Sequence, residues 1–241
     1  MKKTNLFLAR IEDWILQSLT YQRPVETDFL SEEEYATLKN NVFHRVDFIE
    51  DGGYPQAIRK KVIFNSEGYQ SQVVCLKSKY HNKFTSLRHQ DVLGALTSLD
   101  IKRNQIGDIV IFENMVAVYT TATMALFIMN HLHKIKHIGV KFQISTEMLY
   151  QPVQFEEIKI NVSSTRMDTI VAGLMHISRK EANRYIVEGL VYVNDVVVMQ
   201  NSYLCKEQDK ITIRRFGKFI FEASLGVSKK ERLFLLFKKY I

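Results

Sequence analysis

Two helical patterns separated by a short break constrain the fold of this chain more than any other feature. The first opens at residues 164–168 (STRMD) and carries apolar residues at helical spacing to about His176. The second opens at residues 178–181 (SRKE), where the serine hydroxyl can accept from a free amide and the glutamate can reach back, and it runs to Glu188. Gly189 then occupies a position that favours a left-handed residue. The last third of the chain is therefore predicted to begin with a helix pair.

Short strands are predicted after this helix pair. Val191–Val193 and Val196–Val198 flank the dipeptide 194–195 (ND), a pattern typical of a tight hairpin. A further strand is predicted over Ile211–Arg214, and Gly217 interrupts the pattern before Lys218–Phe221. Helices and strands in this order predict a small domain of helices packed on a sheet.

The positive charge of the chain is concentrated in this same third. From Asn161 to the last residue there are 14 Lys and Arg against 8 Asp and Glu, a net charge of +6, while the whole chain of 241 residues carries +7. A basic module on a near-neutral body indicates a polyanionic partner, usually nucleic acid or an anionic membrane surface. A merely solubilising surface is the alternative.

Composition excludes several classes of protein. Hydrophobic residues make up 46% and aromatic residues 11%, which is incompatible with disorder throughout. The longest uncharged run, Met115–His131, is interrupted by threonines and barely long enough for a bilayer, and no secretory signal is recognisable at the N-terminus. Cys75 and Cys205 lie far apart without a CxxC partner, so we expect reduced thiols and a cytoplasmic location.

The first 75 residues predict an α+β arrangement. An amphipathic helix is expected over Leu6–Leu19, and residues 31–34 (SEEE) form a capping box for a second helix to about Asn40. The predicted strands are Val42–Ile49, Val62–Phe64 and Val73–Leu76.

The following segment predicts a small α/β sandwich. Helices are expected over Thr85–Leu99 and from Thr121 or Thr123 to Leu132, and they alternate with strands. The predicted strands are Ile109–Phe112, Val116–Tyr119 and His137–Ile144. We interpret Glu156 and Glu157 as part of a solvated linker.

The cations of the last third form the candidate RNA-binding site. Several stand in the first turn of the second helix, where free amides and the helix dipole already attract phosphate. Others flank Phe216 and Phe219 at a strand end, and cations with aromatic residues suit a structured RNA surface. A solvated rim around two core phenylalanines is the alternative. The candidate residues are Arg166, Ser178, Arg179, Lys180, Arg184, Asn194, Arg214, Arg215 and Lys218.

Signals for metal binding or catalysis are weak. His131 and His133 would point away from each other on a helix, and His137 shares a face with His133 only if that helix continues. Neither cysteine has a neighbouring histidine that would activate it. We therefore predict no metal, no cofactor and no catalytic residue.

Four segments of the last third resemble the S4 RNA-binding domain: residues 166–168 (RMD), 178–182 (SRKEA), 186–194 (IVEGLVYVN) and 209–211 (DKI). That domain is shared by a small-subunit ribosomal protein, tyrosyl-tRNA synthetases, some pseudouridine synthases and a heat-shock ribosome-binding protein. Two positions depart from the usual pattern. Met167 replaces a leucine of similar volume, and Asp195 follows the asparagine where glycine is common.

Upstream, residues 88–96 (RHQDVLGAL), 101–103 (IKR) and 106–109 (IGDI) resemble the middle domain of the bacterial YlmH family, although Gln90 stands at a usual arginine. The resemblance implies an α+β protein of three domains: an N-terminal α+β domain over 1–75, an RRM-like domain over 76–160, and an S4 domain with a basic extension over 161–241. It also implies a cytoplasmic bacterial protein encoded among cell-division genes. Members of the family are tied to the large ribosomal subunit that carries stalled peptidyl-tRNA, in ribosome-associated quality control.

Three functions remain open at this point. The leading hypothesis is a non-catalytic, monomeric RNA-binding protein that docks on 23S rRNA, tRNA or both, on the large subunit and away from membranes. The alternatives are an RNA-modifying enzyme that captures its substrate with the S4 domain, and a division-linked interaction module. The middle domain offers Phe112, Tyr119 and Phe142 for base stacking, or it contacts protein instead. Residues 229–232 and 238–239 form either a second basic patch or a solvated tail.

Overall fold

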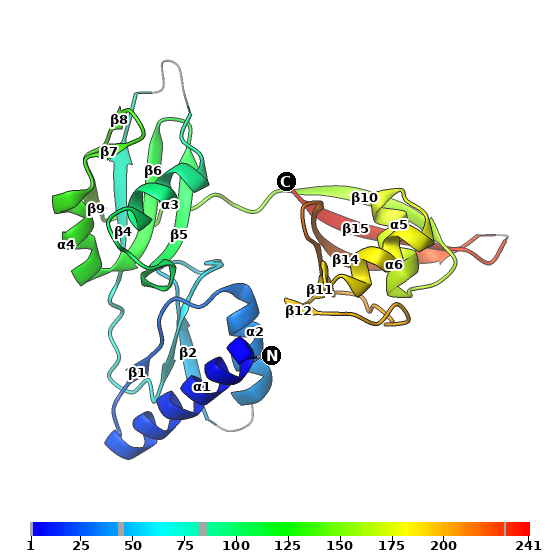
Figure 1. Ribbon diagram of the computed structural model, residues 1–241, viewed down its shortest axis with the longest axis horizontal. Coiled ribbons are helices and arrows are strands. Elements are labelled where there is room, and N and C mark those ends of the chain that lie inside the picture. The colour runs from blue at the N-terminus through cyan, green and yellow to red at the C-terminus, as the bar shows by residue number, and fades with distance from the viewer. Residues whose placement is uncertain (1, 43–45, 82–85, 229) are drawn as a thin grey trace. The chain divides into compact units, whose positions relative to one another are not determined.

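The computed structural model describes residues 2–42, 46–81, 86–228 and 230–241. Their contacts form two compact units, which we call the N-terminal unit (Met1–Gln151) and the C-terminal unit (Pro152–Ile241) (Figure 1). Helices and strands occur in both, which confirms the predicted α+β class.

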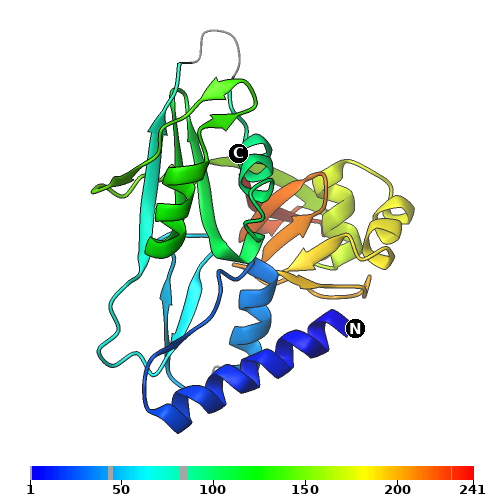
Figure 2. The same ribbon diagram turned by 60° about the vertical axis from the view of Figure 1, so that its left-hand side comes forward.

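The first half of the N-terminal unit packs two helices against a small antiparallel sheet. The sheet has the strand order β1-β3-β2, with β3 in the centre. Figure 2 shows the long helix α1 beside α2. The predicted first helix is confirmed and is longer at both ends. The elements are α1 (Lys2–Tyr21), β1 (Val25–Glu26), α2 (Glu32–Val42), β2 (Phe48–Asp51) and β3 (Lys61–Phe64).

The predicted capping box at the start of α2 is confirmed. Ser31 Oγ accepts from the Glu34 amide at 3.2 Å, and the Glu34 carboxylate accepts from the Ser31 amide at 2.8 Å. The strand predicted over 42–49 is wrong at its first residue, because Val42 ends α2, and the strand begins at Phe48. Residues 43–45 lie outside the described residues.

The second half of the N-terminal unit is a four-stranded antiparallel sheet of order β5-β6-β4-β9. Its strands and helices follow one another as β-α-β-β-α-β, the ferredoxin-like order that RRM domains share. This confirms the predicted sandwich. The elements are β4 (Val73–Lys79), α3 (His89–Thr97), η1 (Arg103–Gln105), β5 (Ile106–Phe112), β6 (Met115–Thr121), α4 (Ala122–His131), β7 (Lys134–Ile135), β8 (Ile138–Gly139) and β9 (Gln143–Ser145).

Helix bounds in this sandwich differ slightly from the prediction. Thr121 is the cap of α4, since its hydroxyl accepts from the Met124 amide at 3.4 Å. The helix predicted from Thr85 begins at His89, and Thr85 itself lies outside the described residues. The single strand predicted over 137–144 is wrong, because the chain forms the short strands β8 and β9 with a break between them.

One face of this sheet packs against α3 and α4, and the chain itself covers part of the other face. Cys75, Ala117 and Tyr119 lie on that second face, with Tyr54 and Leu149 packed over them. Tyr119 is 1% exposed, and its hydroxyl donates to the Leu149 carbonyl at 3.1 Å and accepts from the Leu149 amide at 2.9 Å. The sheet face that stacks bases in an RRM domain is therefore partly occupied by residues of this chain.

The aromatic residues predicted for base stacking are consequently not open platforms. Tyr119 is buried as described, and Phe142 is 5% exposed within the core beneath the helices. Phe112 is half-buried against the cluster around Tyr119. A base could reach the Tyr119 ring only after the segment around Leu149 had moved away.

We expect Tyr119→Phe to lower the free energy of unfolding of the N-terminal unit by about 1–2 kcal/mol, because both Leu149 backbone groups lose a hydrogen-bond partner. The Leu149 amide should exchange faster, and its free energy of opening should fall by a similar amount. Tyr80→Phe is the control, since the Tyr80 hydroxyl donates to the Phe112 carbonyl instead. If both variants left Leu149 exchange at the wild-type rate, the hydroxyl would not hold the segment.

Polar contacts join the two halves of the N-terminal unit. The Arg59 guanidinium donates to the carbonyl oxygens of Phe29 at 2.7 Å and of Ile106 at 3.2 Å. Asp108 is 8% exposed and accepts from the Ile58 amide, the Arg59 amide and the Tyr54 hydroxyl at 2.7–3.0 Å. Residues 1–151 thus cluster as one unit.

The C-terminal unit places two helices across one face of a six-stranded antiparallel sheet of order β10-β15-β14-β13-β11-β12 (Figure 1). Core residues come from both layers, among them Met167, Ile170, Ile186, Phe219 and Phe237. The elements are β10 (Phe155–Val162), α5 (Met167–Met175), α6 (Arg179–Val187), β11 (Val191–Val193), β12 (Val196–Val197), β13 (Lys210–Ile213), β14 (Gly217–Val227) and β15 (Leu233–Tyr240).

The helix pair and hairpin predicted for this unit are confirmed. Gly189 has φ 69°, and Asn194 and Asp195 have φ 49° and 67°, so the hairpin turn is left-handed at both central residues. Aspartate tolerates this conformation, which explains why glycine can be absent at position 195.

Strands β10 and β15 of the C-terminal sheet were not predicted. Glu156 and Glu157 belong to β10 and pair with Lys239 and Lys238 of β15, so their assignment to a linker is wrong. Lys238 and Lys239 are likewise strand residues, not a tail, while Lys229 lies outside the described residues. Strand pairing between segments so distant in sequence leaves only a weak local pattern.

The structure also bears on the predicted domain limits. Residue 160 lies inside β10, which pairs with β15 along its whole length, so the C-terminal unit begins at Pro152 and not after 160. Residue 75 lies inside β4. Division of residues 1–151 into two domains stays a prediction.

None of the described helices combines the length and the apolar character that a bilayer span requires.

Candidate nucleic-acid interface

Asp168 organises the start of both helices in the C-terminal unit. It is 2% exposed at the second position of α5. Its carboxylate accepts two hydrogen bonds of 3.1 Å from the Arg166 guanidinium and one of 2.5 Å from Arg179, the first residue of α6. Two of the predicted RNA-binding arginines are therefore held side by side by one carboxylate.

The charges of this trio explain the pKa of Asp168. Burial alone would raise that pKa, but the hydrogen bonds from Arg166 and Arg179 outweigh it and lower the pKa to about 2. The same contact raises the pKa of Arg166. The trio carries a net charge of +1 at neutral pH, and the Arg179 side chain remains 56% exposed. Asp168 thus neutralises part of the predicted charge while it orients both guanidinium groups.

Ser178 has a structural role at the N-terminus of α6. Its hydroxyl accepts from the Glu181 amide at 3.2 Å, and the Glu181 carboxylate accepts from the Ser178 amide at 3.0 Å. The predicted capping box is thereby confirmed, and the amides that it occupies are not available to phosphate. The contact holds the pKa of Glu181 below its usual value through the Ser178 hydroxyl and amide.

Four exposed cations follow α6 from its first turn to the β13–β14 turn. We call them the cationic strip: Arg179, Lys180, Arg184 and Arg215. Arg214 is also exposed, but its guanidinium lies over Tyr192, on the sheet face away from the helices. Lys180 and Arg184 are four residues apart and therefore share one side of the helix. The described residues contain no carboxylate within ion-pair distance of Lys180 or Arg184. The charge of Arg184 contributes to the lowered pKa of the nearby Glu181 carboxyl, after the hydrogen bonds from Ser178.

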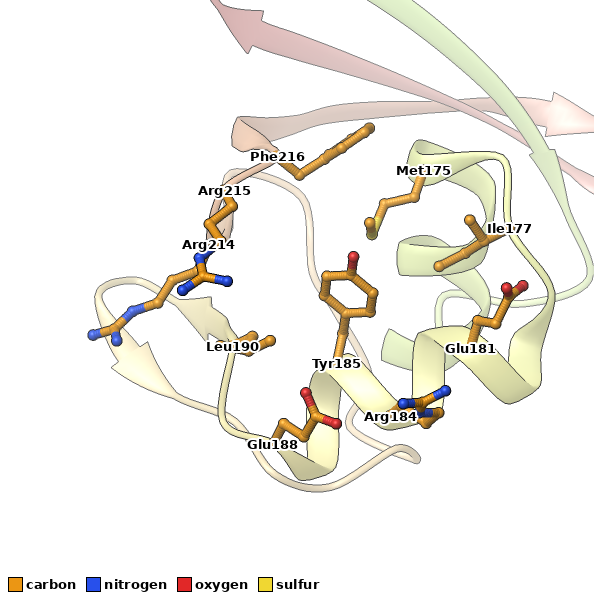
Figure 3. Close-up of a pocket in the computed structure, with 10 residues that line it drawn as sticks. All are labelled: Met175, Ile177, Glu181, Arg184, Tyr185, Glu188, Leu190, Arg214, Arg215 and Phe216. Carbon is orange, nitrogen blue, oxygen red and sulfur yellow. The ribbon is translucent and has the colours of Figure 1, made fainter.

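A cavity of about 430 Å³ adjoins the end of the strip. Arg184 lies on one side of it and Arg214 and Arg215 on the other, and Figure 3 shows the Tyr185 ring between them. The Arg214 guanidinium lies 5.0 Å from the ring centroid of Tyr192. The chain turns tightly here, since Arg215 has φ 65°.

Asn194 and Lys218 are among the predicted residues that lie outside this strip. The Asn194 side chain donates to Asp209 at 2.9 Å and accepts from the Lys210 amide at 3.0 Å, so it fixes the hairpin. Lys218 precedes the core residue Phe219 in β14 and therefore faces away from α5 and α6. RNA binding by these two residues stays a prediction that the cationic strip does not support.

The sequence pattern did not predict the roles of four residues: Phe216, Phe219, Tyr185 and Asp168. Phe219 is fully buried, whereas Phe216 is 42% exposed and lines the cavity, so the two phenylalanines differ in role. Tyr185 was not singled out, although its place one residue after Arg184 was a usable signal. The link from Asp168 to Arg179 was not foreseen, because it joins two helices.

The other candidate sites carry no comparable arrangement. Within the described residues, no three His, Cys, Asp or Glu side chains gather in a way that could hold a metal ion. His131 stacks on Phe127 at a ring distance of 4.2 Å. Cys75 and Cys205 are buried free thiols, and burial raises the pKa of Cys205 to about 12, which disfavours the reactive thiolate.

A second cavity, of about 380 Å³, lies in the N-terminal unit beside Arg59, His89, Arg103 and Asp108. Arg59, Arg103 and Asp108 bind one another or the backbone: Arg103 donates to the Ile106 and Gly107 carbonyl oxygens at 2.6 and 2.9 Å. Burial lowers the pKa of Arg103 to about 10. We interpret these groups as the contact that joins the halves of the unit.

Comparison with known proteins places this architecture in a family. The model described as "Putative RNA-binding domain in YlmH" matches residues 65–148, and the S4 domain model matches residues 165–211. The ribosome-associated protein quality control protein P2 of Bacillus subtilis (strain 168) is 31% identical over an alignment 241 positions long, which covers 94% of each chain. The chain belongs to the YlmH family. The identification from the sequence is thereby confirmed.

A solved structure of the YlmH family supports the fold. The cell division protein ylmH from Streptococcus pneumoniae superimposes with a TM-score of 0.51 at 22% identity, covering 59% of this chain and 91% of that one. The S4 match ends at residue 211, so β14 and β15 lie beyond it and β10 lies before it. This YlmH-family protein therefore carries RNA-binding domains, one of which is an S4 domain enlarged by three strands.

Proposed function

We propose that this protein binds 23S rRNA and tRNA on the large ribosomal subunit through the cationic strip, without catalysis, in ribosome-associated quality control. The observation that carries the proposal is the alignment of exposed cations along α6 up to the cavity, on the helical side of the sheet. Structured RNA is bound largely through its backbone charge and shape, which a continuous row of cations suits. The name of the Bacillus subtilis relative supports the cellular setting.

Asp168 contributes to this function by holding Arg166 and Arg179 in place. A guanidinium already fixed by a carboxylate loses little side-chain entropy on meeting a phosphate. The remaining N–H groups of the 56%-exposed Arg179 can donate to RNA. Arg166, half-buried, supplies a weaker contact.

The test removes two cations of the strip and compares the loss of binding with that caused by removing two cations elsewhere. Lys180→Ala with Arg184→Ala should weaken binding to purified large ribosomal subunits by roughly 10-fold at low salt, and the slope of log affinity against log salt should fall by roughly 1.5. Sedimentation with subunits at several salt concentrations measures both quantities.

Lys159→Ala with Lys238→Ala is the matched control, because it removes the same charge from the sheet face that lies away from the helices. This control should retain at least most of the affinity. If it lost binding while the strip variant kept it, RNA would lie on the opposite face and the proposed site would be wrong. If both double variants lost the same affinity, binding would depend on net charge alone and the strip would not be the binding site.

A further inference from the structure

The cavity beside α6 combines aromatic walls with a charged rim. Its walls include Tyr185, Phe216, Met175 and Leu190, and the exposed Arg184 also lines it. Figure 3 shows Tyr185 and Phe216 projecting into the same space from α6 and from the β13–β14 turn. Its volume of about 430 Å³ lies within the range of small-molecule sites.

Phe216 presents one ring face for stacking. Its other side stacks on buried Phe219, with ring centroids 5.9 Å apart and an interplanar angle of 25°. Phe219 is fixed in the core, so Phe216 is supported from behind while 42% of it stays exposed. A planar aromatic ligand that entered the cavity would cover this apolar surface at little conformational cost.

The rim distinguishes between ligand classes. Arg184 and Arg215 are exposed on opposite sides of the opening, a placement that suits phosphate groups on either side of an inserted ring. Glu188 also lines the cavity, and no hydrogen bond to its carboxylate occurs among the described residues. Carboxylates accept hydrogen bonds from the exocyclic amino groups of bases. An apolar side chain of a partner protein would contact the walls of the cavity but would leave the charged residues of the rim without partners.

We propose that the cavity receives one unstacked RNA nucleobase that bears an exocyclic amino group, stacked on Phe216, with its neighbouring phosphates at Arg184 and Arg215. The inference rests on the proposed function, since it assigns a base contact to the same cationic strip. The stacked base adds a contact that does not depend on salt to the phosphate contacts, which do. Unpaired bases splayed from loops are the elements that proteins stack on aromatic side chains.

The experiment uses an RNA stem-loop with 2-aminopurine in its loop, titrated with the full-length protein. Stacking on Phe216 should quench the fluorescence of the probe. Phe216→Ala should abolish the quenching and weaken binding by about 10-fold or more, with an unchanged salt slope. Phe216→Tyr, which keeps the ring, should restore both readouts.

Phe234→Ala is the matched control, because Phe234 of β15 is also 42% exposed but lies outside the cavity. Wild-type quenching and affinity are expected for it. The inference is overturned if Phe216→Ala behaves like Phe234→Ala, or if an abasic loop binds as tightly as the intact one, while binding remains salt-dependent. Absence of any salt-dependent RNA binding by the wild-type protein would overturn the proposed function as well.

Discussion

Replacing Asp168 by alanine is expected to lower the free energy of unfolding of the C-terminal unit by about 3 kcal/mol. The carboxylate is nearly inaccessible and accepts three hydrogen bonds from Arg166 and Arg179. Without it the two guanidinium groups repel each other at the start of the helix pair. Both arginines are partly exposed, so water compensates for some of the loss.

The contribution of Asp168 should depend on pH in a defined direction. Its pKa is about 2 in the folded protein, below the ordinary value of 3.8. Its stabilisation is therefore complete above the unfolded pKa and is lost as the pH falls towards and through 2. Wild-type protein should lose about 2 kcal/mol from this group between roughly pH 5 and pH 2. Asp168→Ala should lack that part of the acid sensitivity.

Hydrogen exchange resolved by peptide measures this effect within the intact chain. Peptides of α5 and α6 should exchange faster in Asp168→Ala, and peptides of β4 and β6 serve as an internal reference. Glu222→Gln is the control, because its ion pair with Lys238 is partly exposed and should contribute less than about 1 kcal/mol. If both variants showed the same small change, Asp168 would not organise the helix pair.

Replacing Asp108 by alanine should destabilise the N-terminal unit by about 3–5 kcal/mol, the largest effect that we predict. The substitution leaves the Ile58 amide, the Arg59 amide and the Tyr54 hydroxyl without their acceptor. These donors belong to the segment after β2, so the loss also loosens the contact between the two halves of the unit. Asp108→Asn keeps one acceptor oxygen and should cost less.

The Ile58 and Arg59 amides report directly on this contact. Their hydrogen exchange should accelerate in Asp108→Ala, while α5 and α6 peptides keep their wild-type rates. RNA binding through the cationic strip should be retained, because the strip lies in the other unit. If both amides exchanged at the wild-type rate in Asp108→Ala, the role assigned to Asp108 would be contradicted.

Local signals predicted the C-terminal helices well. The capping box at Ser178 and the glycine at 189 are short-range features, since each involves residues within a few positions of one another. Strand β10 was missed because its partner residues in β15 lie 71 to 85 positions further along the chain, beyond any local pattern. Strand β15 was also missed, although it pairs with the neighbouring β14. The candidate site was predicted in the same uneven way: the cations along α6 followed from helical spacing, whereas the positions of Asn194 and Lys218 did not.

The amino-acid sequence by itself determined the helix pair, its caps, the hairpin and the family, because these depend on neighbouring residues or on ordered motifs. Only the tertiary structure decided which cations share a surface, that Asp168 holds two of them, and that Tyr119 is covered. It also decided that Phe216 is open to the cavity while Phe219 is buried. The physical reason is that burial and electrostatic pairing depend on distances in space, which the chain establishes only when remote segments pack together.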